Sequence, residues 1–146
     1  MSELLHDALA RAATETGDQV AVRVDEEAWT FADLDRQSTA FAHHLASQGV
    51  GPRDRVAMMT TNRVEFPVAV HAISKLGAAA VLLSPAWKAA EVDHALSLTA
   101  PVHAVADGPA VELLAERLGA AHVTDLDQLS LAPASAAASR LSSPRM

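Results

Sequence analysis

The sequence contains no cysteine and few aromatic residues. The missing cysteine excludes disulfide bonds, thiolate metal sites and a cysteine nucleophile, and is compatible with a reducing compartment. Only two tryptophans and three phenylalanines occur among 146 residues, although half of the chain is hydrophobic. The core must therefore be built from alanine, valine and leucine, whose small side chains suit close packing of helices on a sheet. The length is that of one domain with a substantial core.

Basic clusters and long apolar segments are also missing. Eighteen acidic residues against eleven basic ones give a formal charge of −7, and no stretch offers the positive surface that binds nucleic acid or an anionic membrane. The longest run of apolar residues and glycine, 77–83, is far shorter than the ~18 residues of a membrane-spanning helix. Glu3, His6 and Asp7 interrupt any secretory signal pattern at the N-terminus. We expect a soluble, cytoplasmic protein that binds neither nucleic acid nor membranes.

Between residues 29 and 107, segments with helical periodicity alternate with short apolar runs. The pattern predicts helices from residue 30 to a stop at Gly49, at about 63–76 and at about 88–98, with buried strands at 56–59, 79–83 and 102–106. A further helix at 109–118 and a last short strand at 121–124 continue it. Strand-helix-strand alternation favours a parallel sheet with right-handed crossover helices. The predicted fold class is α/β with a mostly parallel sheet.

The first thirty residues predict two additional elements. Residues 1–15 show the apolar face of an amphipathic helix, and residues 19–30 indicate a short antiparallel hairpin beside the parallel sheet. At the end of this segment, the Thr30 hydroxyl can accept a hydrogen bond from the backbone N–H near Asp33 and so begin the next helix. The apolar face of that helix contains Phe31, Leu34, Phe41 and Leu45.

The helix at about 64–76 is apolar on nearly every side. Such a helix is covered by the sheet on one side and by something else on the others. We expect part of its surface to be exposed when this chain is alone. Pro67 fits if the helix begins near Val64 or if the helix is kinked.

The end of the chain differs in composition from the rest. Residues 132–146 are mostly alanine, serine and proline, and such a segment buries too little apolar surface to offset the entropy of ordering it. We therefore expect an α/β subdomain over residues 1–131 and a disordered tail over 132–146.

Five short pieces follow one another over about eighty residues of the chain. In this order and spacing they resemble the opening of an adenylate-forming (AMP-binding) enzyme, a superfamily that includes acyl- and aryl-CoA synthetases, peptide synthetase adenylation domains and beetle luciferases. The resemblance spans roughly residues 4–129, with Arg53 where the family usually has glycine and Ser84 where many members have asparagine. The five pieces are Thr30-Phe31-Ala32-Asp33-Leu34, residues 49–57 (Gly-Val-Gly-Pro-Arg-Asp-Arg-Val-Ala), Asn62 with Glu65-Phe66, Gly77-Ala78-Ala79, and Ser84-Pro85.

The resemblance implies the N-terminal portion of an acyl- or aryl-CoA synthetase-like enzyme. Such enzymes activate a carboxylic acid with ATP and Mg and then usually pass the acyl group to CoA or a carrier thiol. The family's Ser/Thr/Gly-rich phosphate loop, its aromatic-Gly-Thr/Ser-Glu segment, its ribose-binding aspartate and its C-terminal lysine do not occur here, and no glycine follows Gly119. We expect no catalytic residue and no cofactor bound by this chain alone, whereas ATP, Mg and CoA serve the full-length family.

Residues 84–88 form the candidate binding segment. They leave the C-terminal end of a predicted parallel strand, where ligands bind in open α/β sheets. By resemblance, the corresponding loop of CoA-forming members helps to hold the nucleotide end of CoA, which makes Ser84, Pro85 and Lys88 candidate cofactor-binding residues. The alternative is a plain strand-to-helix loop in which Trp87 covers the core. The seven histidines include no pair at metal-ligand spacing with an acidic helper, so we expect no metal site.

Three functions are compatible with these observations. The chain is the N-terminal part of an acid–CoA ligase that is inactive alone, a non-catalytic binding or interaction module derived from that fold, or a degenerate product. The first predicts a partner chain that supplies the missing half, and exposed apolar surface would also allow self-association. The DNA beyond codon 146 separates them, because a downstream phosphate-loop sequence supports the first or the third.

Overall fold

The computed structural model describes residues 5–16, 18–24, 27–61 and 63–129. The expected tail and the boundary at residue 131 lie outside this part of the chain. The elements are α1 (Leu5–Thr16), β1 (Val20–Val24), β2 (Glu27–Thr30), α2 (Phe31–Ser47), β3 (Arg55–Met59), α3 (Glu65–Lys75), β4 (Ala79–Leu82), α4 (Ala89–Thr99), β5 (His103–Ala106), α5 (Pro109–Leu118), the 3₁₀ turn η1 (Ala120–His122), β6 (Val123–Asp125) and the 3₁₀ turn η2 (Leu126–Gln128).

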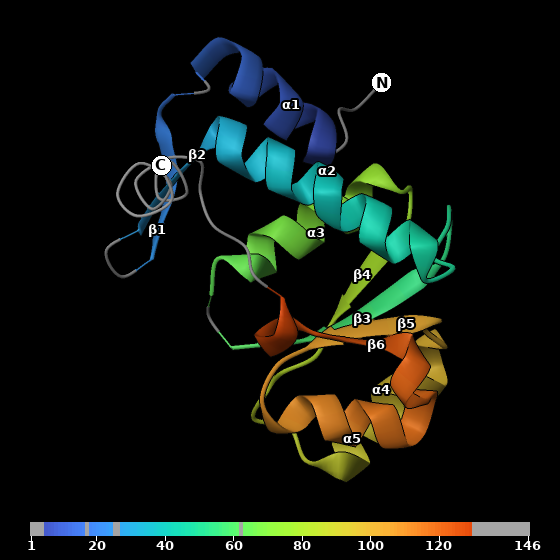
Figure 1. The fold of residues 1–146 in the computed structure, drawn as a ribbon. Coiled ribbons are helices and arrows are strands. Elements are labelled where there is room, and N and C mark those ends of the chain that lie inside the picture. The colour runs from blue at the N-terminus through green and yellow to red at the C-terminus, as the bar shows by residue number, and fades with distance from the viewer. Residues whose placement is uncertain (1–4, 17, 25–26, 62, 130–146) are drawn as a thin grey trace.

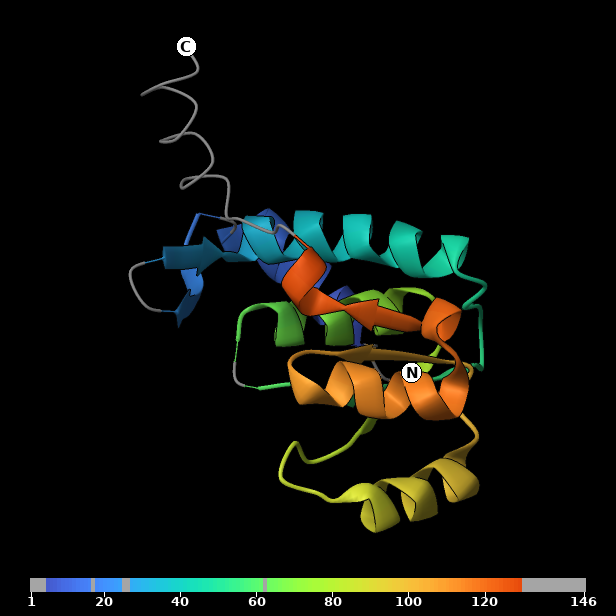
Figure 2. The same ribbon diagram turned by 60° about the horizontal axis from the view of Figure 1, so that its bottom comes forward.

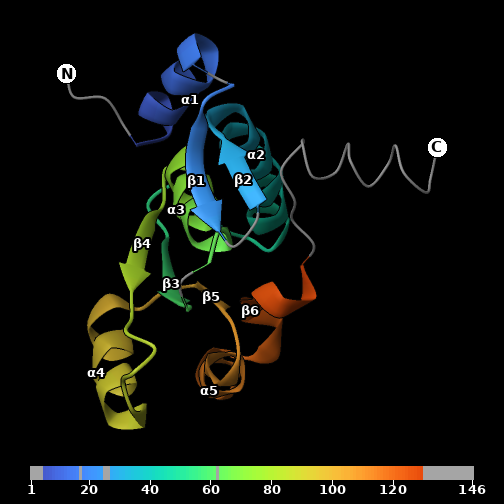
Figure 3. The same cartoon turned by 90° about the vertical axis from the view of Figure 1, so that its left-hand side faces the viewer.

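Four strands form one parallel sheet in the order β4-β3-β5-β6. This confirms the α/β fold class and the parallel sheet expected from the alternating pattern. Helices α1, α2 and α3 lie on one face of the sheet, and α4 and α5 lie on the other (Figure 1, Figure 2). Strands β1 and β2 pair antiparallel in a separate two-stranded sheet, which lies beside α2 (Figure 3).

Successive residues of a strand point to opposite faces of the sheet, and the two faces differ in side-chain size. In β3, Val56 and Met58 belong to the core beneath α1, α2 and α3, whereas Ala57 belongs to the core above α4 and α5. In β5, Ala104 and Ala106 also face α4 and α5. The small alanine side chains allow these helices to approach the strands closely.

The start of α2 follows the sequence prediction in atomic detail. The Asp33 N–H donates to the Thr30 hydroxyl (3.0 Å), and the Thr30 N–H donates to the Asp33 carboxylate (3.0 Å). This reciprocal pair satisfies two backbone donors that the first turn of a helix leaves free. At the other end, Gly49 adopts a φ of 95°, a backbone conformation that favours glycine.

Helix α3 begins at Glu65, so Pro67 falls within the first turn, where a missing N–H costs no hydrogen bond. No residue of α3 is fully exposed, but Phe66 and Val70 are only half-buried, so the exposure that we expected of this helix is partial. Helices α1 and α2 provide the cover, and Lys75 of α3 forms an ion pair with Asp35 of α2 (2.8 Å). Among the described residues, the large exposed apolar side chains are Val20, Leu82, Trp87, Leu98 and Val102.

The last strand begins two residues later than predicted. Gly119, with a φ of 94°, ends α5 and opens the turn η1, so that β6 starts at Val123. Of the helices in the described ranges, none is both long enough and apolar enough to cross a lipid bilayer.

Candidate functional site

The sheet has a crevice at the carboxyl ends of its two central strands. Strands β3 and β5 are neighbours, but β3 leads into α3 on one face and β5 leads into α5 on the other. Where adjacent parallel strands send the chain to opposite faces, the loops separate and leave room for a ligand. The topology therefore places the candidate site between the ends of β3 and β5.

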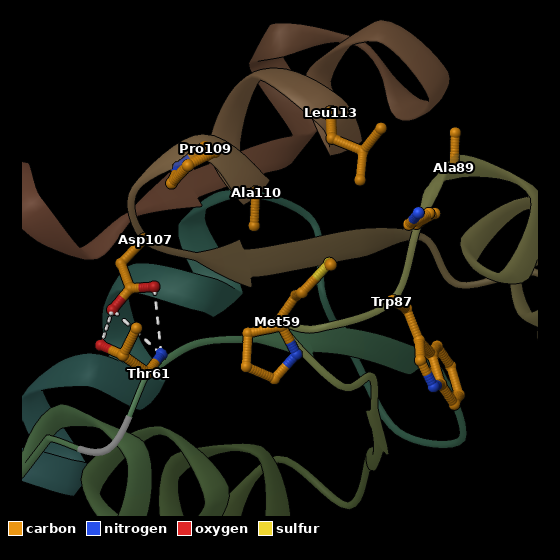
Figure 4. Close-up of a pocket in the computed structure, with 10 residues that line it drawn as sticks. Met59, Thr61, Trp87, Ala89, Asp107, Pro109, Ala110 and Leu113 are labelled. Carbon is orange, nitrogen blue, oxygen red and sulfur yellow. Dashed lines mark hydrogen bonds between the residues drawn. The ribbon is translucent and has the colours of Figure 1, made fainter.

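A cavity of about 430 Å³ occupies this crevice. This volume lies within the range of small-molecule sites, about 300–1,000 Å³. Most of its wall is apolar, with Asp107 and Thr61 on one side and Trp87 on the other (Figure 4). Its lining residues are Met59, Thr61, Pro85, Trp87, Lys88, Ala89, Asp107, Pro109, Ala110 and Leu113.

The polar side of the cavity is built from Asp107 and Thr61, which directly follow the crevice strands. The Asp107 carboxylate is 5% exposed and accepts the Thr61 hydroxyl (2.7 Å) and the Thr61 backbone N–H (3.1 Å to Oδ1). A buried carboxylate is costly unless such donors satisfy it. The bonds tie the loop after β3 to the end of β5 and fix the shape of this wall.

Arg63 extends the same network to a third strand. Its Nη1 donates to Asp107 (3.1 Å) and to Asp127 of η2 (2.8 Å), and its Nε donates to Glu65 (2.9 Å). The hydrogen bond with Glu65, followed by those with Asp127 and Asp107, raises the pKa of Arg63 above its ordinary value. The bond from Arg63 also lowers the pKa of Asp127. One guanidinium therefore connects the loops that follow β3, β5 and β6.

The sequence-predicted residues 84–88 lie at the opposite wall. Pro85 and Lys88 line the cavity, whereas the Ser84 hydroxyl accepts the Ala86 N–H (3.2 Å) in the turn and is not part of the lining. Within the described residues, the Lys88 ammonium has no carboxylate partner. It is therefore a cation without a carboxylate partner among these residues, at the edge of a mostly apolar cavity.

Sequence reasoning missed Thr61, Arg63 and Asp107. The positions of Thr61 and Asp107 could have indicated them, because each follows a predicted strand by one or two residues. Ligand-binding side chains gather at such positions in parallel sheets. Within the described ranges, no group of three or more histidine or acidic residues is arranged to hold a metal ion.

A second polar cluster lies on the other face of the sheet, under α2. The buried Thr124 hydroxyl lies 2.8 Å from His103 Nε2 and 3.1 Å from His44 Nε2. Among the described residues, His103 Nδ1 has no hydrogen-bond partner. Burial, and then the nearby charges of His44 and His122, lower the pKa of His103 to about 4. This cluster joins α2, β5 and β6 without contacting the cavity.

Comparisons with known proteins give consistent matches. The family model described as AMP-binding enzyme matches residues 9–144. The chain is 37% identical over 94 residues to triostin synthetase I of Streptomyces triostinicus, covering 64% of this chain and 17% of that protein. It is 39% identical over 88 residues to the long-chain-fatty-acid–CoA ligase of Salmonella typhimurium, covering 59% of this chain and 16% of that protein.

The solved structures match the same fold. The O-succinylbenzoate coenzyme A synthetase of Bacillus subtilis, in complex with ATP and magnesium ion, superposes with a TM-score of 0.77 at 25% identity, covering 88% of this chain and 35% of that chain. An unliganded structure of that synthetase gives a TM-score of 0.78 at 26% identity, covering 88% and 28%. The chain thus spans about a third or less of the length of these relatives.

Proposed function

Because this chain belongs to the AMP-binding enzyme family, we propose that it is the N-terminal part of an ATP-dependent carboxylic acid–CoA ligase. Its contribution is the cavity at the ends of β3 and β5, which receives the nucleotide end of CoA. Adenylation of the acid requires the phosphate loop and the catalytic lysine, which this sequence lacks. The chain alone is therefore inactive in this proposal.

The observation that carries the proposal is the position of Lys88 and Pro85 on the wall of the cavity at the ends of β3 and β5. A free ammonium can attract a phosphate, and the apolar walls formed by Met59 and Leu113 suit the faces of a base. Asp107 offers carboxylate oxygens that accept hydrogen bonds from amino groups. One cation neutralises only part of the charge of CoA, so the remaining phosphate contacts are assigned to the rest of a complete ligase.

The sequence alone led us to expect no cofactor bound by this chain. The cavity between the ends of β3 and β5 instead leads us to propose that the 146-residue chain binds CoA weakly, and binding of CoA tests this. Isothermal titration with CoA compares the unchanged chain, Lys88→Gln, and Arg53→Gln as a control that removes an exposed cation at the opposite, amino end of β3. We expect Lys88→Gln to weaken binding about two- to five-fold, the effect of one exposed charge contact, and Arg53→Gln to leave it unchanged. Equal losses for both variants, or no binding to the unchanged chain, would contradict the assignment.

ATP–pyrophosphate exchange tests the predicted inactivity. Because positioning and charge stabilisation by the missing groups supply most of the rate in such reactions, the purified chain should show only background exchange with any carboxylic acid. Adding a separately expressed remainder of a related ligase is expected to restore exchange. Exchange by the 146-residue chain alone would refute the proposal.

The second candidate is a non-catalytic binding module. The packing favours it, because α1 and α2 pack on α3 within the chain and both faces of the sheet carry helices. A module that acts alone binds its ligand without the missing half, and an added ligase remainder does not restore exchange. The exchange assay with an added ligase remainder therefore distinguishes the candidates, because exchange is restored only if the chain is part of a ligase.

A further inference from the structure

The two oxygens of the Asp107 carboxylate differ in how many hydrogen bonds they accept. Oδ2 accepts three, from the Thr61 hydroxyl (2.7 Å), from Arg63 Nη1 (3.1 Å) and from the Thr61 N–H (3.2 Å). Among the described residues, Oδ1 accepts only the same Thr61 N–H, at 3.1 Å. Each carboxylate oxygen offers about two acceptor sites. Oδ2 is therefore saturated, whereas Oδ1 keeps one lone pair for a further donor.

The remaining lone pair lies on the cavity side of the carboxylate. In Figure 4, one Asp107 oxygen points back to the Thr61 hydroxyl, and the other points toward the part of the cavity where Met59 and Ala110 lie. Asp107 is only 5% exposed, and a hydrogen bond to a charged group with so little water around it is stronger than one made in solvent. This wall of the cavity therefore presents one anionic acceptor with room for one donor.

A single acceptor of this kind discriminates between purine bases. Adenine presents an exocyclic amino donor at N6, whereas guanine and hypoxanthine carry the O6 carbonyl, an acceptor, at the equivalent position. A carbonyl oxygen placed against a carboxylate is repelled, and the carboxylate is left without its donor. Guanine can instead donate from N1 and N2 together, but that paired arrangement needs both carboxylate oxygens, and Oδ2 is already occupied by Thr61 and Arg63.

We propose that Asp107 selects the base of the bound nucleotide, and that this base is an adenine whose N6 amino group donates to Oδ1. The inference rests on the proposed binding of the nucleotide end of CoA and deepens it by naming the residue that reads the base. The layout of the cavity supports it, because Trp87 and Ala89, the chain neighbours of Lys88, lie on the side opposite Asp107 (Figure 4). A ligand with an amino group at one end and a phosphate at the other matches this order of charges.

Titration with two ligands, followed by the backbone amide signals in NMR spectra, tests the selection. The ligands are CoA and deamino-CoA, in which hypoxanthine replaces adenine so that a carbonyl takes the place of the amino group. We expect the unchanged chain to bind CoA about ten-fold more tightly than deamino-CoA, the effect of one hydrogen bond to a charged group. Equal affinities would overturn the role of Asp107 and leave CoA binding intact. Binding of neither ligand would refute both proposals.

The variant Asp107→Asn tests the residue itself, because it removes the charge and retains the shape of the side chain. The preference for CoA should fall to about two-fold or less. Glu112→Gln is the matched control, since it makes the same chemical change at an exposed position of α5 outside the cavity lining, and it should keep the full preference. A preference that persists in Asp107→Asn, or that disappears in Glu112→Gln, would overturn the inference.

A third measurement remains decisive if Asp107→Asn does not fold. The Thr61 N–H donates to Oδ1, the oxygen that receives the amino group in this proposal. Its signal in the unchanged chain should therefore shift on addition of CoA and shift much less at the same occupancy of deamino-CoA. Equal shifts of the Thr61 signal with the two ligands would show that the amino group does not reach Asp107.

Discussion

Acidification should destabilise this protein through His103, which is 1% exposed. Burial lowers the pKa of His103 to about 4 from 6.5, so the folded state favours the neutral ring. Below pH 6.5 the unfolded chain takes up a proton that the folded chain does not, and stability falls until the pH reaches the folded pKa. The difference in pKa corresponds to about 3 kcal/mol in total, of which about 2 kcal/mol is lost between pH 7.5 and pH 5.

Urea denaturation at these two pH values measures the loss. The variant His103→Gln keeps an amide that can reach Thr124 but does not titrate, so its stability should fall by about 2 kcal/mol less than that of the unchanged chain. His43→Gln is the control, because His43 is exposed on α2 and should leave the pH dependence unchanged. If His103→Gln and the unchanged chain lose the same stability on acidification, the reasoning about the buried ring is wrong.

Four further substitutions test the packing and the backbone by urea denaturation. Leu45→Ala should lower the free energy of unfolding by about 2 to 5 kcal/mol because Leu45 is fully buried. Gln48→Ala at the exposed end of α2 should lower it by about 0.5 kcal/mol or less. Equal losses would show that the helix faces are misassigned. Arg53→Gly should stabilise by about 1 kcal/mol, because Arg53 adopts a φ of 70° that strains a residue with a Cβ atom. Ala100→Gly should also increase stability, because Ala100 at the end of α4 has a φ of 48°. A loss of stability in either glycine variant would show that the backbone there is not strained.

The helices and strands were predictable because their signals are local. Periodicity located the parallel strands within a few residues, and the Thr30 and Asp33 pair was readable from two side chains three positions apart. The left-handed backbone at Arg53 also had a sequence signal, since the related family usually has glycine there. Each of these features depends on residues that are neighbours along the chain.

The cavity wall was not predictable in the same way. Asp107 and Thr61 are separated by 46 positions, and their contact requires β3 and β5 to be neighbours, which no local pattern encodes. The burial of His103 was not predictable for a similar reason. Its partner Thr124 lies on β6, and nothing local in the sequence indicates that the two side chains meet. The extent to which α3 is covered was not predictable, because the positions of α1 and α2 depend on tertiary packing rather than on the pattern of α3 itself.

Because side-chain size differs between the two faces of the sheet, the two faces should tolerate different substitutions. Met58 and Ala57 are adjacent and equally buried, yet Met58 supports the α2 and α3 side and Ala57 the α4 and α5 side. Shortening Met58 would leave an empty space, whereas enlarging Ala57 would force α4 and α5 away from the strand. Within this strand, one position therefore should not tolerate a smaller side chain, and the next should not tolerate a larger one.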